Sequence, residues 1–413
     1  MNPGSIAMLA AMLAGTVMAA DAPPQGYKPS AAQIALAGQL RMPPQPPGRN
    51  AYPLLWSFGF DLSTTQVDAA YKADRAIALR WTDGAHAEHE RTGAWPRFPY
   101  AAATVGKPSR SVPDGDYALL CGLAVSSCLD QVRARREAIR AVLVRNAVLL
   151  ARVQSLAGYD TWWNTMPADS MLPVAGALPA LKFWASAAAL RFVDGDAVGG
   201  LDMACTAAAT FRRLHAHANT VLDTAFTETG ARSQVHLAAE MMAALPEGAQ
   251  VPDACQVAMA PVVAADVDYR GAAAFEWAFA VRSNEVGGHP DDAFAVLGYI
   301  VALGGVPGQK AMLDDTAVPT VDPASVTFDQ NYADLLSGRI ARGADYIATL
   351  RMGALALWLQ AHPSHDPLER RLATAPVGAL AKRLTVACAG HCLRMEHRSE
   401  GFASGRTWPI ATP

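Results

Sequence analysis

The segment ACAGHCLRMEH, residues 387–397, holds the densest group of side chains in this chain that could do chemistry. Cys388, His391, Cys392 and His397 offer the thiolate and imidazole groups that zinc prefers as ligands. A c-type haem is attached through Cys-x-x-Cys-His, in which the histidine directly follows the second cysteine. Here His391 precedes Cys392, so the order of the residues argues against a haem, and we predict no cofactor.

A disulfide between Cys388 and Cys392 is the interpretation that competes with a metal site. Neighbouring thiols in an oxidising compartment tend to form a disulfide. A helix would hold the two Cβ atoms about 5–6 Å apart, whereas a disulfide requires about 3.5–4.5 Å. Because Thr385 and Val386 favour a strand, we predict a small β-hairpin in which the loop 389–391 sets the two cysteines opposite each other. We expect this disulfide and no bound metal.

The other four cysteines are Cys121, Cys128, Cys205 and Cys255. An even number of cysteines in an exported protein indicates disulfides, although six cysteines allow 15 pairings. Proximity along the chain favours Cys121–Cys128 and Cys205–Cys255. The alternative for Cys205, which lies in the apolar segment LDMACTAAATF, is a buried free thiol that packs as a small apolar residue.

Glu276 is a candidate catalytic residue because it lies in the apolar segment GAAAFEWAFAV. A carboxyl group in such surroundings needs a partner or takes up a proton, and both situations recur at catalytic sites. His236 and Glu240 are four residues apart and could face Glu276 from a neighbouring helix. Structural hydrogen bonding between packed helices explains the same three residues without any catalysis.

Several common catalytic and nucleotide-binding patterns are absent from the sequence. It contains no GxSxG, Ser-x-x-Lys or HExxH motif, no P-loop and no dinucleotide-binding GxGxxG. The net charge of −3 provides no broad basic field, so nucleic-acid binding is not expected. These absences make an enzyme the less favoured interpretation.

The N-terminus has the character of a secretory signal peptide, which we assign to residues 1–20. This segment has no charged side chain, and residues 6–20 form an apolar run of fifteen residues, which is short for a membrane span. No lysine or arginine precedes the run, which departs from the usual signal. We expect a periplasmic or secreted protein with no transmembrane segment in the mature chain.

The remaining sequence predicts an all-α protein. Residues 21–50 are rich in proline and predict an irregular arm, and residues 51–413 predict a single helical domain, with a subdivision near residue 117 as an alternative. Apolar residues recur at helical spacing over 129–156, which predicts one continuous helix there. Several segments have the pattern of two helices joined by a turn, which predicts stacked antiparallel helical hairpins, arranged as a bundle or a short solenoid. The C-terminal β-hairpin is the one expected exception to this all-helical body.

Two functions remain open at this point. The favoured one is a non-catalytic, exported helical protein that binds a protein or a cell-envelope component, in a scaffold, accessory or immunity-type role. The alternative is a hydrolase or lyase with a site assembled from helices around Glu276, together with His236 and Glu240.

Overall fold

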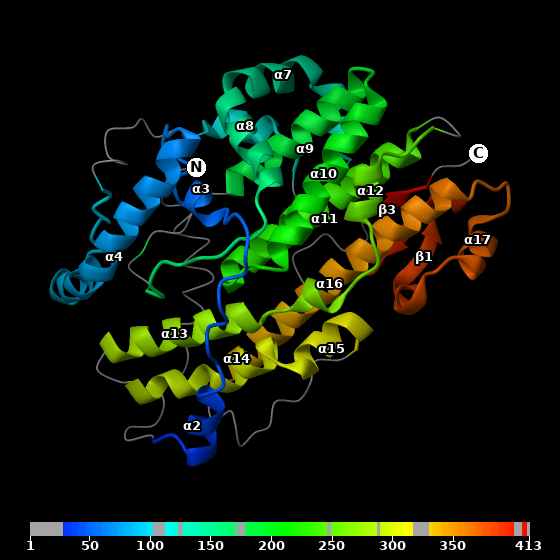
Figure 1. The fold of residues 1–413 in the computed structure, drawn as a ribbon. Coiled ribbons are helices and arrows are strands. Elements are labelled where there is room, and N and C mark those ends of the chain that lie inside the picture. The colour runs from blue at the N-terminus through cyan, green and yellow to red at the C-terminus, as the bar shows by residue number, and fades with distance from the viewer. Residues whose placement is uncertain are drawn as a thin grey trace.

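A computed structural model describes residues 28–101, 112–122, 127–169, 172, 178–245, 249–286, 290–316, 330–399 and 407–410. The chain is mostly helical, as predicted, and carries a small antiparallel sheet near its C-terminus (Figure 1). The predicted signal peptide, residues 1–20, and the beginning of the predicted arm lie outside the described residues.

The α-helices are α2 (Ala31–Ala37), α3 (Tyr52–Trp56), α4 (Thr64–Thr92), α5 (Asp114–Leu119), α6 (Cys128–Ala134), α7 (Arg136–Arg145), α8 (Ala147–Ser155), α9 (Leu178–Val193), α10 (Ala197–His215), α11 (Val221–Ala243), α12 (Asp253–Ala258), α13 (Arg270–Val286), α14 (Leu297–Gly304), α15 (Val306–Asp314), α16 (Gln330–Ala361) and α17 (Leu368–Thr374). The 3-10 helices are η1 (Leu156–Gly158), η2 (Ala264–Val267), η3 (Pro290–Val296), η4 (Gly378–Arg383) and η5 (Cys388–Gly390). The strands are β1 (Leu384–Ala387), β2 (Cys392–Met395) and β3 (Thr407–Pro409).

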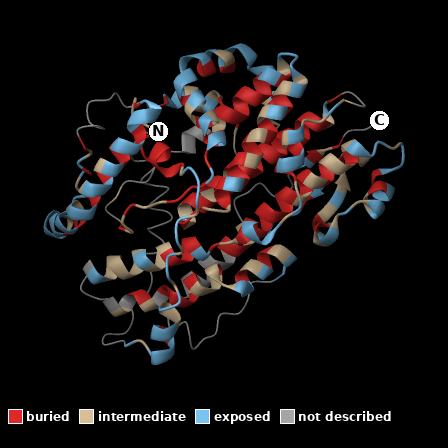
Figure 2. Cartoon of the chain, viewed as in Figure 1, coloured by how far each residue is buried: buried red, intermediate tan, exposed pale blue. Residues whose placement is uncertain are grey.

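Helix α11 forms the centre of the molecule. It packs against α9, α10, α13 and α16, and Figure 2 shows it buried along most of its length. Small residues permit this close packing: a Cβ atom added to Gly230 would lie 2.7 Å from the ring of Phe211 on α10. Since α11 is surrounded on several sides, polar side chains on it must find partners on neighbouring helices.

The long helix predicted over 129–156 is wrong as a single element, because the structure divides it into α6, α7 and α8. The backbone leaves helical geometry at Arg135 (φ −130°) and at Asn146 (φ −109°). The Asn146 side chain donates to the carbonyl of Val142 (2.9 Å) and to the carboxylate of Asp116 (3.1 Å). An asparagine that bonds nearby groups in this way competes with the helix, and it fixes the turn between α7 and α8.

The N-terminal arm is not irregular throughout. Ser30 begins α2 with a capping box, in which its hydroxyl accepts from the Gln33 amide and the Gln33 side chain accepts from the Ser30 amide. Further along, the Arg49 amide donates to the Asp160 carboxylate (2.8 Å), and Asn50 forms a bridge with Thr161. These contacts fasten the end of the arm to the segment that follows η1.

The predicted C-terminal hairpin and its disulfide are confirmed, but the predicted register is wrong by one residue. Strands β1 and β2 pair antiparallel with Ala387, not Cys388, opposite Cys392, and the disulfide joins Cys388 to Cys392 within the loop 388–391. Strand β3, which the sequence did not predict, pairs with the other edge of β2 and carries the buried Trp408 against α11. The sheet therefore covers part of the central helix.

The other two predicted disulfides are also confirmed. Cys121 is bonded to Cys128, and Cys205 to Cys255, so Cys205 is not a free thiol. Within the described ranges, no single helix is long and apolar enough to cross a membrane. One pair of consecutive helical segments, residues 136–145 and 147–158, together has the length and composition of a membrane span, but the two segments are bent by 79° relative to each other.

Candidate functional site

Glu276 lies on α13 where this helix crosses the first turn of α11. Its carboxylate accepts a hydrogen bond from the amide of Val221, the first residue of α11 (3.2 Å). Burial raises the pKa of Glu276 to about 7, and the negative charge of nearby Asp223 adds to the rise, while the Val221 amide opposes it. The side chain nevertheless keeps some exposure to solvent, so this carboxyl group can exchange protons near neutral pH.

Asp223 is a second buried carboxyl group in the same turn. Its amide donates to the Thr220 hydroxyl (2.9 Å), which in turn donates to the Asp223 carboxylate (2.7 Å). Burial raises the pKa of Asp223 to about 7, against the hydrogen bonds of Thr220 and Trp162. No basic side chain pairs with either carboxyl group in the part of the chain that the structure describes. The two acids therefore share one weakly solvated environment.

Two tyrosines from the N-terminal helices lie near Asp223. Tyr52 on α3 and Tyr71 on α4 lie edge to face, with ring centroids 5.8 Å apart. Burial raises the pKa of Tyr71 to about 12, and burial together with the charge of Asp223 raises that of Tyr52 well above its usual value. Both phenols therefore remain protonated and can donate hydrogen bonds. We call Asp223, Glu276, Tyr52 and Tyr71 the acid cluster.

His236 and Glu240 lie elsewhere, which corrects the predicted grouping with Glu276. They do contact each other, with His236 Nδ1 3.1 Å from a Glu240 carboxylate oxygen. However, His236 follows Val221 by fifteen residues, and a helix rises 1.5 Å per residue, so about 20 Å separates it from the turn that Glu276 contacts. The sequence indicated which residues share a helix face but not where the helices cross.

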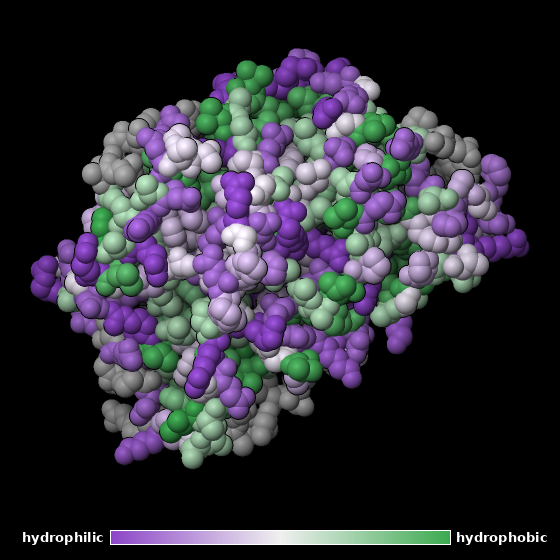
Figure 3. Space-filling model, viewed as in Figure 1, coloured by the Kyte–Doolittle hydropathy of each residue, from purple (hydrophilic) through white to green (hydrophobic). Residues whose placement is uncertain are grey.

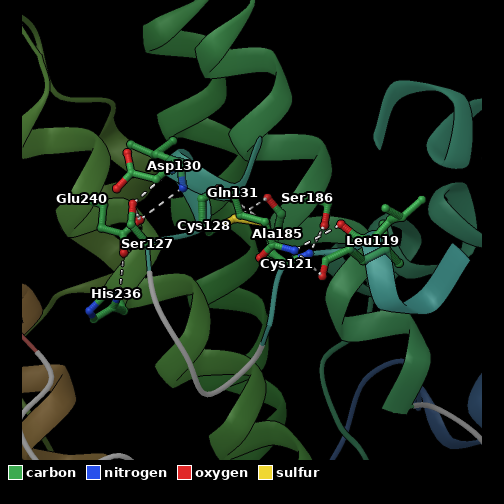
Figure 4. Close-up of a disulfide and its surroundings, with 12 residues drawn as sticks. Leu119, Cys121, Ser127, Cys128, Asp130, Gln131, Ala185, Ser186, His236 and Glu240 are labelled. Atoms are coloured by element: carbon green, nitrogen blue, oxygen red, sulfur yellow. Dashed lines mark hydrogen bonds and ion pairs between the residues drawn. A yellow bond between two sulfur atoms is a disulfide. The ribbon is translucent and has the colours of Figure 1, made fainter. Parts of the chain in front are cut away.

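Glu240 has a structural environment beside the Cys121–Cys128 disulfide (Figure 4). Its carboxylate accepts from the Ser127 hydroxyl (3.3 Å) and from the Leu129 amide (3.5 Å) at the start of α6. The ring of His236 lies edge to face against Trp408 of β3, at 4.8 Å between centroids. These contacts join α6, α11 and the C-terminal sheet.

A buried ion pair occupies the middle of α11. Glu228 accepts from both guanidinium NH2 groups of Arg339 on α16 (2.6–2.8 Å) and from the hydroxyl of Tyr269. Burial alone would raise the pKa of Glu228, but the charge and hydrogen bonds of Arg339 lower it to about 2. The sequence does not indicate this pair, because a glutamate in the segment TAFTETG gives no sign of burial.

No group of three or more histidine, cysteine, aspartate or glutamate side chains suited to a metal is found within the described ranges. His397, a ligand in the zinc alternative, instead lies near Asp345 on α16, at 3.6 Å between Nδ1 and a carboxylate oxygen. A polar cleft of about 260 Å³ opens beside the hairpin. Arg383 and Arg398, which line the cleft, are paired with Asp315, another lining residue (3.3 and 3.0 Å).

Comparisons with known proteins gave no match: no protein-family model fits the chain, and neither curated proteins nor solved structures are similar to it at a significant level.

Proposed function

We propose that this chain is an exported protein of an oxidising compartment, periplasmic or secreted, and that it binds a protein or a cell-envelope component. The observation that carries the proposal is the pairing of all six cysteines in three disulfides. Disulfides persist in oxidising compartments and are rare in the cytosol of most organisms. The predicted signal peptide, residues 1–20, agrees with this location.

The arrangement of the disulfides supports a binding role that requires a durable scaffold. Cys205–Cys255 ties α10 to α12 across a separation of 50 residues, next to the central helices. The consecutive packing of α9, α10 and α11 supports the predicted stack of helical hairpins as part of this proposal. A rigid helical body of this kind can present one surface to a partner.

We place the partner surface at the corner between α7 and α8. Val144 is 70 % exposed and Val148 is 42 % exposed, on either side of the turn at Asn146. In Figure 3, small apolar groups reach the surface among hydrophilic side chains, and one of them lies at the top, over α7 and α8. Exposed apolar side chains that gather on a protruding corner are suited to burial in a complex.

Recovery of a partner from envelope extract tests this proposal. The purified mature chain is the bait, at near-native salt, and bound proteins are identified by mass spectrometry. We expect a stoichiometric partner that is lost with Val144→Asp together with Val148→Asp. The control is Val306→Asp. This valine is 74 % exposed and lies on α15, well apart from α7 and α8 in Figure 1. Equal recovery with both variants, or no stoichiometric partner, would contradict the proposal.

A second candidate function is acid–base catalysis by a hydrolase or lyase, and the acid cluster is the observation that favours it. Two carboxyl groups with pKa values near 7 and a shared environment release their protons in succession, so one can be a general acid while the other is a general base. The predicted role of Glu276 is kept in this candidate, with Asp223 in place of His236 and Glu240.

Product release from isolated envelope material tests the second candidate. Polysaccharide and peptide fragments are measured by mass spectrometry after incubation with wild type, Glu276→Gln and Glu285→Gln. Glu285 is an exposed residue on the same helix and serves as the control. Loss of a product with Glu276→Gln alone, and an apparent pKa near 7 in the rate, would support catalysis. Identical products from all three proteins would reject it.

A further inference from the structure

The Cys388–Cys392 disulfide differs from the other two in its access to solvent. Cys121 and Cys128 are 1 % and 8 % exposed, and Cys205 and Cys255 are fully buried. Cys388, in contrast, belongs to the exposed residues of the chain, together with Ala389 and His391 of the same loop. A reagent in solution can therefore reach this disulfide without unfolding the protein.

The backbone of the loop holds two residues in a disfavoured conformation. Cys388 has φ 51° and Ala389 has φ 53°, both in the left-handed region that residues with a Cβ atom rarely adopt. Gly390 follows with φ 94°, which a glycine tolerates. Closure of the loop by the disulfide keeps the two residues in this conformation. Opening the disulfide frees them to relax, which favours reduction at this position over the two buried disulfides.

We propose that the Cys388–Cys392 disulfide is a site of thiol–disulfide exchange that accepts thiolates from small-molecule thiols or from accessible cysteines of other proteins. In the first step a thiolate attacks Cys388 Sγ, the new sulfur–sulfur bond forms, and Cys392 leaves as a thiolate. A second thiolate then attacks the sulfur of the first, the oxidised pair of thiols departs, and Cys388 is released as a thiolate. The protein disulfide is reduced by two electrons, and the two thiols are oxidised to one disulfide.

The two cysteines have different surroundings, which gives them different roles in the exchange. Cys392 is only 3 % exposed and lies in β2, where it pairs with Ala387 on one side and Pro409 on the other. Its position is therefore held after the bond opens, so it can attack a mixed disulfide at Cys388 and expel the attached thiol. This activity is independent of the partner surface proposed above.

Differential alkylation of the folded, full-length mature chain tests the inference. The protein is incubated with reduced glutathione, free thiols are blocked with one label, and the remaining disulfides are then reduced and blocked with a second label. Mass spectrometry reports each of the three pairs separately, while circular dichroism confirms that the protein stays folded. We expect Cys388–Cys392 to open at least about tenfold faster than the two buried disulfides. Opening of all three together, or of a buried pair first, would overturn the inference.

Two variants separate exchange from simple exposure and distinguish the sources of thiol. Ala389→Gly removes the left-handed penalty at one position, so we expect slower reduction by several fold; an unchanged rate would overturn the role of the backbone.

Cys392→Ser leaves Cys388 unable to expel a captured thiol, and Cys388→Ser is its control. Incubated with glutathione disulfide or with a peptide carrying a mixed disulfide, Cys392→Ser should retain the corresponding adduct. Adducts only with glutathione assign small thiols, adducts with both assign protein cysteines as well, and none with either would overturn the inference.

Discussion

Replacing Asp223 by asparagine removes a buried carboxyl group from the first turn of α11 and changes how the stability of the protein depends on pH. The pKa of Asp223 is raised by burial from 3.8 to about 7. Between these two values the folded protein keeps a proton that the unfolded chain has released. The free energy of unfolding therefore falls as the pH rises from about 4 to about 7, and it levels off above pH 7.

The size of this effect follows from the shift. One pH unit corresponds to about 1.4 kcal/mol, so a rise of about three units gives a loss on the order of 4 kcal/mol by pH 8. The pKa of Glu276 is raised from 4.5 to about 7, so this residue also makes the free energy of unfolding fall as the pH rises. The Asp223→Asn variant retains an oxygen that accepts the hydrogen bond of Thr220 but no longer titrates. Its stability should therefore depend less on pH than that of the wild type.

Urea denaturation followed by circular dichroism, at pH values from 4 to 8, measures this difference. We expect Asp223→Asn to gain about 4 kcal/mol relative to the wild type between pH 4 and pH 8. Asp202→Asn on α10, where the aspartate is exposed, is the matched control and should run parallel to the wild type. Curves for Asp223→Asn that are also parallel to the wild type would refute the reasoning, because they would show that Asp223 ionises normally.

Three further predictions concern the ties between the central helices and their neighbours. Glu228→Gln leaves the buried guanidinium of Arg339 without its counter-charge and should lower the free energy of unfolding by about 3–5 kcal/mol in denaturant titrations, whereas a loss below 1 kcal/mol would contradict a buried pair. Replacing both Cys205 and Cys255 by serine should cost about 4 kcal/mol, since a long loop is freed in the unfolded chain; calorimetry under oxidising conditions checks this. Asp345→Asn should make the C-terminal segment sensitive to limited proteolysis, because the carboxylate binds two backbone amides of that segment; an unchanged cleavage pattern would contradict its anchoring role.

Two of the three disulfides and the C-terminal hairpin were predictable because they depend on local features. Cys121–Cys128 and Cys388–Cys392 join residues close in sequence, and strand-forming residues before Cys388 already argued against a helix there. The third strand was not predictable, because β3 is brought to β2 by the tertiary fold and consists of only three residues.

The break in the long helix and the acid cluster depend on contacts between distant segments. Nothing in the periodicity of 129–156 shows that Asn146 will bond to Asp116, which lies thirty residues earlier. Glu276 was recognised from its apolar surroundings, but its neighbour Asp223 was not. The pattern Thr220-x-x-Asp223 could have marked a helix start, although it carries no sign that both carboxyl groups meet at one turn.

The export proposal is tested most directly by the state of the protein in its own cells. Cells are fractionated after thiols are trapped by acid and alkylation, and the protein is analysed by intact mass and N-terminal sequencing. We predict that it is found in the periplasmic or secreted fraction, cleaved near residue 20, with no alkylated cysteine among Cys121, Cys128, Cys205 and Cys255. A full-length cytoplasmic protein with these thiols alkylated would contradict the proposal.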